Sequence, residues 1–292
     1  KKIYLTINYS QEILKKLLRK STKEKLIIWN QIIFIFKMIE KLTIIIPSRI
    51  HEKQSKFLKK AVTSILNQTI IKKFDFTILV VLDNGSNTKK IDLKITQNVK
   101  FIESSGHTQA TALNAGIKEA LGENGFVSIL EDDDEWLPEF LFFARQAVNN
   151  FDFVSSNQSQ INEEGKFLNV LDFPTPSGWF MPVTTLKRVG KFNESFRWHL
   201  DNEWLGRLSQ TKSRRLHLIE SNAQRDRPEL QKLVDFSLGF SKIGRHTLST
   251  PLIKRTIHSV SGTSQILNDK SKFEDSQREY DLLNKKFGRI PW

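Results

Sequence analysis

Cysteine is absent from the 292 residues of the chain, so neither disulfide bonds nor thiolate zinc sites can form. The absence of disulfides fits a reducing compartment, and we expect a cytoplasmic protein. No apolar run reaches the ~20 residues that a transmembrane helix needs, and the opening KKIYLTINYS does not form a signal peptide. Neither G-x-G-x-x-G nor G-x-x-x-x-G-K-[ST] occurs, which excludes the usual Rossmann dinucleotide site and the P-loop.

Acidic residues are outnumbered by basic ones. The chain has 45 Lys and Arg against 32 Asp and Glu, a formal net charge of +13. This excess favours anionic partners, namely nucleotide diphosphates, anionic lipid headgroups or nucleic acid, without choosing among them.

Residues 1–40 are predicted to be a helical appendage. Ser21 and Glu24 form a capping-box pattern ahead of KLIIWNQIIFIFKMI, which is apolar nearly all round. We interpret this segment as a helix packed on the body of the protein. The alternative is an interfacial helix in peripheral contact with an anionic membrane.

From Leu42 on, short β-branched runs alternate with amphipathic segments. The predicted strands are LTIII, FTILVVL, VKFIE and FVSIL, and the predicted helices are KFLKKAVTSILNQ and TQATALNAGIKEAL. This alternation predicts an α/β fold with a mostly parallel central sheet and helices on both faces. Beyond Asn150 we expect a strand at FDFVSS, a hairpin around Glu164-Gly165 and a mobile loop over 209–229.

Three of the predicted strands end in polar residues: Pro47-Ser48-Arg49, Asp83-Asn84 and the four acids Glu131 to Asp134. Because parallel strands end at one edge of a sheet, these residues should surround one crevice. Four like charges repel one another unless a cation lies among them, and Mg²⁺ and Mn²⁺ prefer carboxylate oxygens. The acids should lie in a tight strand-to-helix junction before PEFLFFARQAV. A solvated acidic loop is the competing interpretation.

With these pieces in order, the sequence resembles the family 2 glycosyltransferases of the GT-A fold. The resemblance covers roughly residues 41–265 and rests on motifs that occur in the family's order. They are LTIIIPSRIHE, AVTSILNQT, ILVVLDNGSN, GHTQATALNAGIKEA, VSILEDDDEWLP, PSGWFMPVTTLKRVGKFNESF and HLDNEWLGRL. Together they are specific for the family, but not for the sugar or the acceptor.

The resemblance implies an inverting enzyme that moves a sugar from a nucleotide-diphosphate donor, foremost a UDP-sugar, to a hydroxyl of a glycan, lipid-linked or small-molecule acceptor. It implies a donor-binding half over 41–150, an acceptor-binding half over 151–292 and Mn²⁺ or Mg²⁺ on the diphosphate. The residues that it assigns to the metal are Glu131, Asp133, Asp134 and His258. Those that it assigns to the donor are Pro47, Ser48, Arg49, Asp83, Asn84, Asp132 and Arg255.

Inversion requires a general base that deprotonates the acceptor hydroxyl, and Asp201 matches that base in HLDNEWLGRL. Glu203 is a competitor, although two positions away on a helix it should face elsewhere. The alternative role for Asp201 is a helix N-cap, and the two roles are compatible. Of Trp179, Trp198 and Trp204, we expect only one to line the acceptor site.

Three other functions are kept open. A nucleotidyltransferase also uses acids and Mg²⁺, but it would carry a Gly-rich loop after the first strand, where PSRIHEKQSKF has no glycine. A glycosyltransferase acting on nucleic acid is suggested by the net charge and by the basic stretch 212–227. A non-catalytic sugar-binding module is the third, and the presence of both Asp133 and Asp201 argues against it.

Overall fold

The computed structural model describes residues 40–49, 54–84, 97–171, 173–218, 251–259 and 261–288. The helices expected within residues 1–39, and the lipid contact considered for them, lie outside the described residues, as does the basic stretch beyond Leu218. Residues from Lys41 on belong to one compact unit. The expected boundary near residue 150 between a donor half and an acceptor half stays a prediction.

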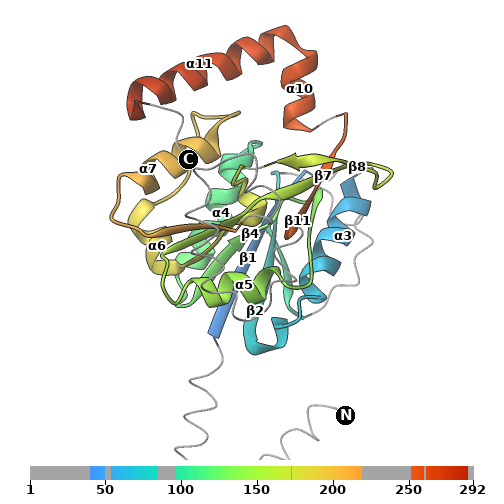
Figure 1. The fold of residues 1–292 in the computed structure, drawn as a ribbon, viewed down its shortest axis with the longest axis vertical. Helices are drawn as coiled ribbons and strands as arrows, with labels where there is room; N and C mark the ends of the chain where they lie inside the picture. Colours follow the sequence, from blue (N-terminus) through green and yellow to red (C-terminus); the bar gives the residue numbers. More distant parts are fainter. Residues whose placement is uncertain are drawn as a thin grey trace, which may run out of the picture. The chain divides into compact units, whose positions relative to one another are not determined.

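Seven strands form the main sheet in the order β10-β6-β9-β4-β1-β2-β3 (Figure 1). The β1–β4, β2–β3 and β6–β10 pairs are parallel, whereas β9 runs antiparallel to both of its neighbours, β4 and β6. The expected α/β class with a mostly parallel sheet is confirmed. The strands are β1 (Glu40–Ser48), β2 (Phe74–Leu82), β3 (Val99–Glu103), β4 (Phe126–Ile129), β6 (Phe153–Ser156), β9 (Phe180–Pro182) and β10 (Arg215–Leu218).

A second sheet of four strands has the order β5-β11-β7-β8. Its strands are β5 (Asp134–Trp136), β7 (Gln158–Asn162), β8 (Phe167–Leu171) and β11 (Ile253–Ile257). The antiparallel β7–β8 pair is the expected hairpin, and its turn uses Gly165 at a φ of +82°.

Two expectations about local structure were wrong. The last acid, Asp134, does not lie in a strand-to-helix junction but opens β5, because β11, distant in sequence, offers that short segment an antiparallel partner. Residues 215–218, expected to belong to a mobile loop, form β10, because the free edge of β6 pairs with them. Both elements depend on a partner strand far along the chain.

Helices cover both faces of the main sheet: α3 (Gln54–Leu66) and α5 (Phe140–Ala147) lie on one face, and α4 (Gln109–Leu121), α6 (Val183–Val189) and α7 (Leu200–Ser209) on the other. Two further helices, α10 (Gly262–Asn268) and α11 (Lys270–Phe287), follow β11, and η1 (Ile71–Lys73) and η3 (Pro176–Gly178) are short 3₁₀ turns. In the described part of the chain, no helix combines the length and the apolar character needed to cross a membrane.

The central strands β1 and β4 are buried on both faces, as their apolar runs predict. In β1, Ile44 and Ile46 join the apolar core with α3 and α5, whereas Ile45 between them joins the core with α4, α6 and α7. Because successive side chains of a strand point to opposite faces, one continuous apolar run serves both cores. The polar residues that follow the strands are thereby held at the rim of the sheet.

Substitution of Gly116 in α4 tests how closely this helix packs against β1. A Cβ at this position would lie 2.5 Å from Cγ2 of Ile45, which is fully buried and has no space to move. We expect Gly116→Ala to destabilise the protein by about 1–3 kcal/mol through overpacking, measured as a lower Tm in thermal denaturation. Gly262→Ala is the control, because a Cβ there would meet no atom within 4 Å; an equal loss in both variants would contradict the packing argument.

Candidate functional site

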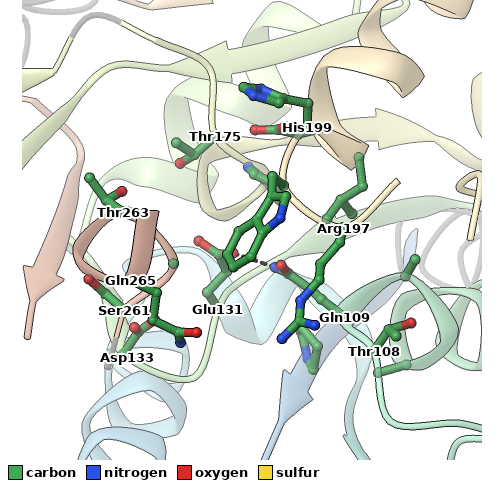
Figure 2. A pocket seen from close by; sticks show the side chains of 18 of the residues that line it. Thr108, Gln109, Glu131, Asp133, Thr175, Arg197, His199, Ser261, Thr263 and Gln265 are labelled. Atoms are coloured by element: carbon green, nitrogen blue, oxygen red, sulfur yellow. Dashed lines mark hydrogen bonds between the residues drawn. The ribbon is translucent and has the colours of Figure 1, made fainter. Parts of the chain in front are cut away.

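A cavity of about 380 Å³ lies where β1, β2 and β4 end (Figure 2). Most of the site residues expected from the sequence line it, namely Pro47, Ser48, Arg49, Asp83, Glu131, Asp132, Asp133, Asp201, Arg255 and His258. Asn84 is exposed, and neither Asn84 nor Asp134 is among the lining residues. The strand ends therefore meet at one crevice, as a parallel sheet dictates.

Asp132 and Asp134 are buried, and hydroxyl groups from other elements hold them. The Ser48 hydroxyl at the end of β1 donates to Asp132 Oδ2 at 2.5 Å. Asp134 accepts hydrogen bonds from the Ser177 hydroxyl at 2.5 Å and from the Thr256 backbone N–H at 3.2 Å. Burial raises the pKa of Asp132 and of Asp134 well above the usual range, and the nearby Asp133 carboxylate raises both further.

Glu131 faces the cavity and accepts a hydrogen bond from the side-chain amide of Gln109, which is drawn as a dashed line in Figure 2. Its backbone N–H donates to the Ser177 hydroxyl at 3.1 Å. Burial is the main cause of a raised pKa at Glu131, and the Arg255 guanidinium opposes it. Gln109 and Ser177 were not predicted as site residues, although both lie within motifs of the family resemblance.

Three carboxylates fit a divalent cation. One oxygen each of Glu131, Asp133 and Asp134 lies within 4.8 Å of the other two. Burial is the main cause of the raised pKa values at Glu131 and Asp134, and the neighbouring Asp133 carboxylate raises both further. A hard cation with oxygen ligands would relieve the repulsion among the three carboxylates. Asp134 is buried and does not line the cavity, so Glu131 and Asp133, which do, are the better-placed ligands.

His258 is fixed between two side chains. Its Nε2 lies 2.8 Å from Asp133 Oδ2, and its ring stacks on Phe57 of α3 with centroids 5.4 Å apart. The hydrogen bond to Asp133 is the main cause of a raised pKa at His258. In this arrangement His258 contacts a candidate metal ligand and is not itself a member of the three-carboxylate cluster.

Arg255 of β11 lies among the acids. It lies opposite Asp134 in the β5–β11 pairing. Burial lowers its pKa, but the carboxylates around it outweigh burial and raise the pKa above the ordinary value. They are, from the largest effect, Glu131, Asp134, Asp133 and Asp201. One permanent positive charge therefore lies among four acids from different parts of the chain.

Asp83 and Arg49 form a second polar group of the cavity, directly after β2 and β1. Arg49 Nε lies 3.6 Å from Asp83 Oδ2, and its Nη2 donates to the His107 carbonyl at 3.1 Å. Both side chains line the cavity and are partly exposed to it. They offer a carboxylate and a guanidinium to a bound ligand.

Asp201 is the second residue of α7, lines the cavity and is half-buried. The N-cap of this helix is His199, so the capping role considered for Asp201 is not the one found. Burial raises the pKa of Asp201, while the backbone N–H of Asn202, which donates to Oδ1 at 2.8 Å, opposes the rise.

Glu203 is buried away from the cavity. It pairs with Arg207 at 2.9 Å and with Lys286 of α11 at 2.8 Å. The prediction that it faces elsewhere than Asp201 is confirmed. Its role is structural, because both of its partners join α7 to neighbouring segments.

Of the three tryptophans considered for the acceptor site, two are core residues and one lines the cavity. Trp179 and Trp204 are fully buried in the core and pack on each other at 4.9 Å between centroids. Trp198 lines the cavity, and the Arg197 guanidinium lies 5.0 Å from its ring centre. Of the three, Trp198 lines the cavity, and its contact with the acceptor stays a prediction.

Comparison with known proteins places these residues in a family. The family model of Glycosyl transferase family 2 matches residues 43–208, more than half of the chain. The match spans the strand ends, the acid cluster and Asp201.

Individual relatives are more distant. The succinoglycan biosynthesis protein ExoW of Rhizobium meliloti (strain 1021) is 28% identical over 117 residues, which cover 38% of this chain and 35% of ExoW. An uncharacterized glycosyltransferase of Rickettsia conorii is 28% identical over 129 residues, covering 42% of this chain and 20% of that protein. The chain thus matches about a third or less of these relatives' length. Among solved structures, S. aureus TarS 1-349 in complex with UDP-GlcNAc has a TM-score of 0.46 and 14% identity, covering 85% of this chain and 81% of that one.

The buried ion pairs of Glu203 predict that replacing this residue lowers the stability of the protein. Glu203→Gln removes the charge that two cations share, and breaking a buried pair costs about 3–5 kcal/mol. We expect a markedly lower Tm in thermal denaturation. The control is Glu274→Gln, because Glu274 is exposed and its partner Lys270 is 4.0 Å away; a Tm no lower than that of the control would show that Glu203 is not structural.

The crowded acids predict that Mn²⁺ stabilises the protein in a pH-dependent way. Their pKa values are raised on folding, so their contribution to stability is present at low pH and is lost as the pH rises through the raised pKa values. A divalent cation binds the ionised form, so the gain in Tm should be larger at pH ~7.5 than at pH ~5. At a hundredfold excess over Kd the stabilisation should be about 2.7 kcal/mol.

Thermal shift with Mn²⁺, and with EDTA as the reference, measures this effect. Asp133→Asn keeps the shape of the site and should remove most of the shift. An unchanged Tm at pH ~7.5, or an equal gain in Asp133→Asn, would refute a metal at the cluster.

Proposed function

The chain belongs to glycosyl transferase family 2, and we propose that it moves a sugar from a nucleotide-diphosphate donor to an acceptor hydroxyl with inversion at the anomeric carbon. The observation that carries this proposal is that Asp201 and the acids after β4 line one cavity. An inverting displacement needs a base for the acceptor's proton and groups that stabilise the departing diphosphate. The cavity offers both.

The donor side is formed by the strand ends. Asp83, Arg49 and Asp132 are proposed to receive the base and ribose of the nucleotide, because they follow β1, β2 and β4 and line the cavity. Arg255 is proposed to pair with the diphosphate, since a guanidinium matches phosphate oxygens in charge and in geometry. A nucleoside diphosphate also fits the net positive charge of the chain.

Glu131 and Asp133, with Asp134, are proposed to hold the divalent metal, Mn²⁺ or Mg²⁺. Such an ion would neutralise the negative charge that gathers on the departing diphosphate. His258 holds Asp133 through Nε2 at 2.8 Å, and Gln109 holds Glu131. These two contacts fix the orientation of both carboxylates before any ligand binds.

Asp201 is proposed as the general base. Burial raises its pKa, which makes the carboxylate a stronger base than an exposed aspartate. The Asn202 N–H and the N-terminal position in α7 favour the ionised form, so the group can accept a proton at neutral pH. Oδ1 is occupied by the Asn202 N–H, which directs the proton to Oδ2.

The acceptor is proposed to be a glycan, a lipid-linked sugar or a small hydroxyl compound that meets Trp198. An aromatic face and a neighbouring guanidinium suit a polar ring with hydroxyl groups. The cytoplasmic location expected from the absence of cysteine is part of this proposal.

A hydrolysis screen tests the donor without knowledge of the acceptor. The protein is incubated with Mn²⁺ and a panel of UDP-, GDP-, CDP- and dTDP-sugars, and release of the nucleoside diphosphate is measured. We expect one nucleotide class to be hydrolysed well above the others, with UDP-sugars first in line. The absence of metal-dependent release across the whole panel would count against the proposed activity.

Asp201→Asn separates binding from chemistry. The variant should bind UDP with Mn²⁺ as the wild type does, because the nucleotide site does not include Asp201. Its turnover should fall by about 10²–10⁴-fold, the usual contribution of a general base. Calorimetry with UDP and the turnover assay give the two readouts.

Asp281→Asn is the matched control, since it makes the same change on the exposed surface of α11. Glu203→Gln, assayed below its own Tm, should retain most of the turnover. Wild-type turnover in Asp201→Asn together with an inactive but folded Glu203→Gln would reverse the assignment of the base.

A further inference from the structure

One carboxylate of the C-terminal helix holds a wall of the cavity. Glu279 of α11 accepts hydrogen bonds from three consecutive backbone N–H groups. The Arg197 N–H donates to Oε1 at 2.7 Å, and the N–H groups of Trp198 and His199 donate to Oε2 at 2.8 and 2.9 Å. All three are charge-assisted bonds, which are shorter and stronger than neutral ones.

The residues held in this way lie directly before α7. Arg197, Trp198 and His199 line the cavity, and Asp201 follows two positions later. His199 is the N-cap of α7 but forms no capping bond with its side chain. Glu279 accepts from the backbone N–H of this N-cap residue, the bond that a Glu three positions later makes in a capping box, and it places a negative charge near the N-terminus of α7.

The rest of α11 contacts the same region along one stripe. The Ser276 hydroxyl lies 2.9 Å from His199 Nε2, and the rings of Tyr280 and His199 meet edge to face at 6.2 Å between centroids. Phe287 lies so close to α7 that a Cβ on Gly206 would come within 2.4 Å of its ring. Positions 276, 280 and 287 recur at helical spacing, so one face of α11 contacts α7 and the segment before it. In Figure 1, α7 lies below one end of α11.

This contact contributes little to the apolar core. Of the described residues of α11, only Ser276 and Leu283 are buried, while Phe273 and Leu282 are 52% and 56% exposed. A helix that merely filled the core would bury an apolar stripe. The main interactions of α11 with the body are instead polar, and they converge on the segment that precedes Asp201 and on Glu203.

We propose that Glu279 is a positioning residue, which holds the Arg197–His199 segment and thereby sets the place of Trp198 and Asp201 at the acceptor side of the cavity. Glu279 is not among the residues that line the cavity, so it acts through the backbone that it binds. The proposal rests on the proposed function for the role of Asp201. It requires a carboxylate, because an amide has one acceptor oxygen and can retain at most two of the three bonds.

The test compares Glu279→Ala, Glu279→Gln and the control Glu274→Gln. Glu274 lies on the same helix and is exposed. Hydrogen exchange measured without any ligand reports on the amides of Arg197, Trp198 and His199. Turnover and KM for the nucleotide sugar that the wild type hydrolyses fastest, and affinity for UDP with Mn²⁺, report on the site.

In Glu279→Ala, we expect exchange at these three amides to rise at least about tenfold, since hydrogen bonds to a charged group are lost. Exchange in β1 and β4 should stay as in the wild type. Turnover should fall by up to about 10²-fold, the effect of a misplacement near 1 Å, with KM and UDP affinity within about twofold of wild type. Glu279→Gln should be intermediate, and Glu274→Gln should match the wild type.

Three results would overturn the proposal: unchanged exchange at the three amides, raised exchange with wild-type turnover, or equal loss of protection throughout the protein in Glu279→Gln. The last would show a general structural role. A wild-type protein that hydrolyses no nucleotide sugar would refute the proposed function instead. The exchange experiment, which needs no ligand, would still decide whether Glu279 holds the segment.

Discussion

Burial of several carboxylates at the end of β4 is the constraint on which the site depends. Charged groups removed from water must gain hydrogen bonds, a cation or a proton. Burial raises the pKa values of Glu131, Asp132 and Asp134, because the hydrogen bonds and the cation around them offset the loss of water only in part. The donors that meet them come from β1, α4, η3 and β11. The strand ends, two sheets and a helix terminus must therefore be in place together before these acids are tolerated.

The second sheet serves this constraint. β5 begins at Asp134 and pairs with β11, which brings Arg255 opposite the acid. The same strand leads into His258, whose Nε2 reaches Asp133. A segment far along the chain thus supplies both the permanent cation and the imidazole. In the proposed function, this cation holds the departing diphosphate while it balances the acids around it.

The two walls of the cavity are held in different ways. The strand ends are anchored by two apolar cores, whereas the wall before α7 is held by polar bonds from Glu279. Polar bonds near the surface open more readily than core strands.

The sequence by itself determined the α/β class, the ends of the main strands and the acid cluster, because hydrophobic periodicity and local turn residues are properties of short segments. It also indicated Asp201 through motif order, and through helical spacing that Glu203 faces elsewhere than Asp201. Only the tertiary structure decided that Asp134 opens a strand, that His199 caps α7 and that Glu279 holds the segment before it. Each of these depends on a partner distant in the chain, and a pairing between distant segments leaves no period or spacing in either one.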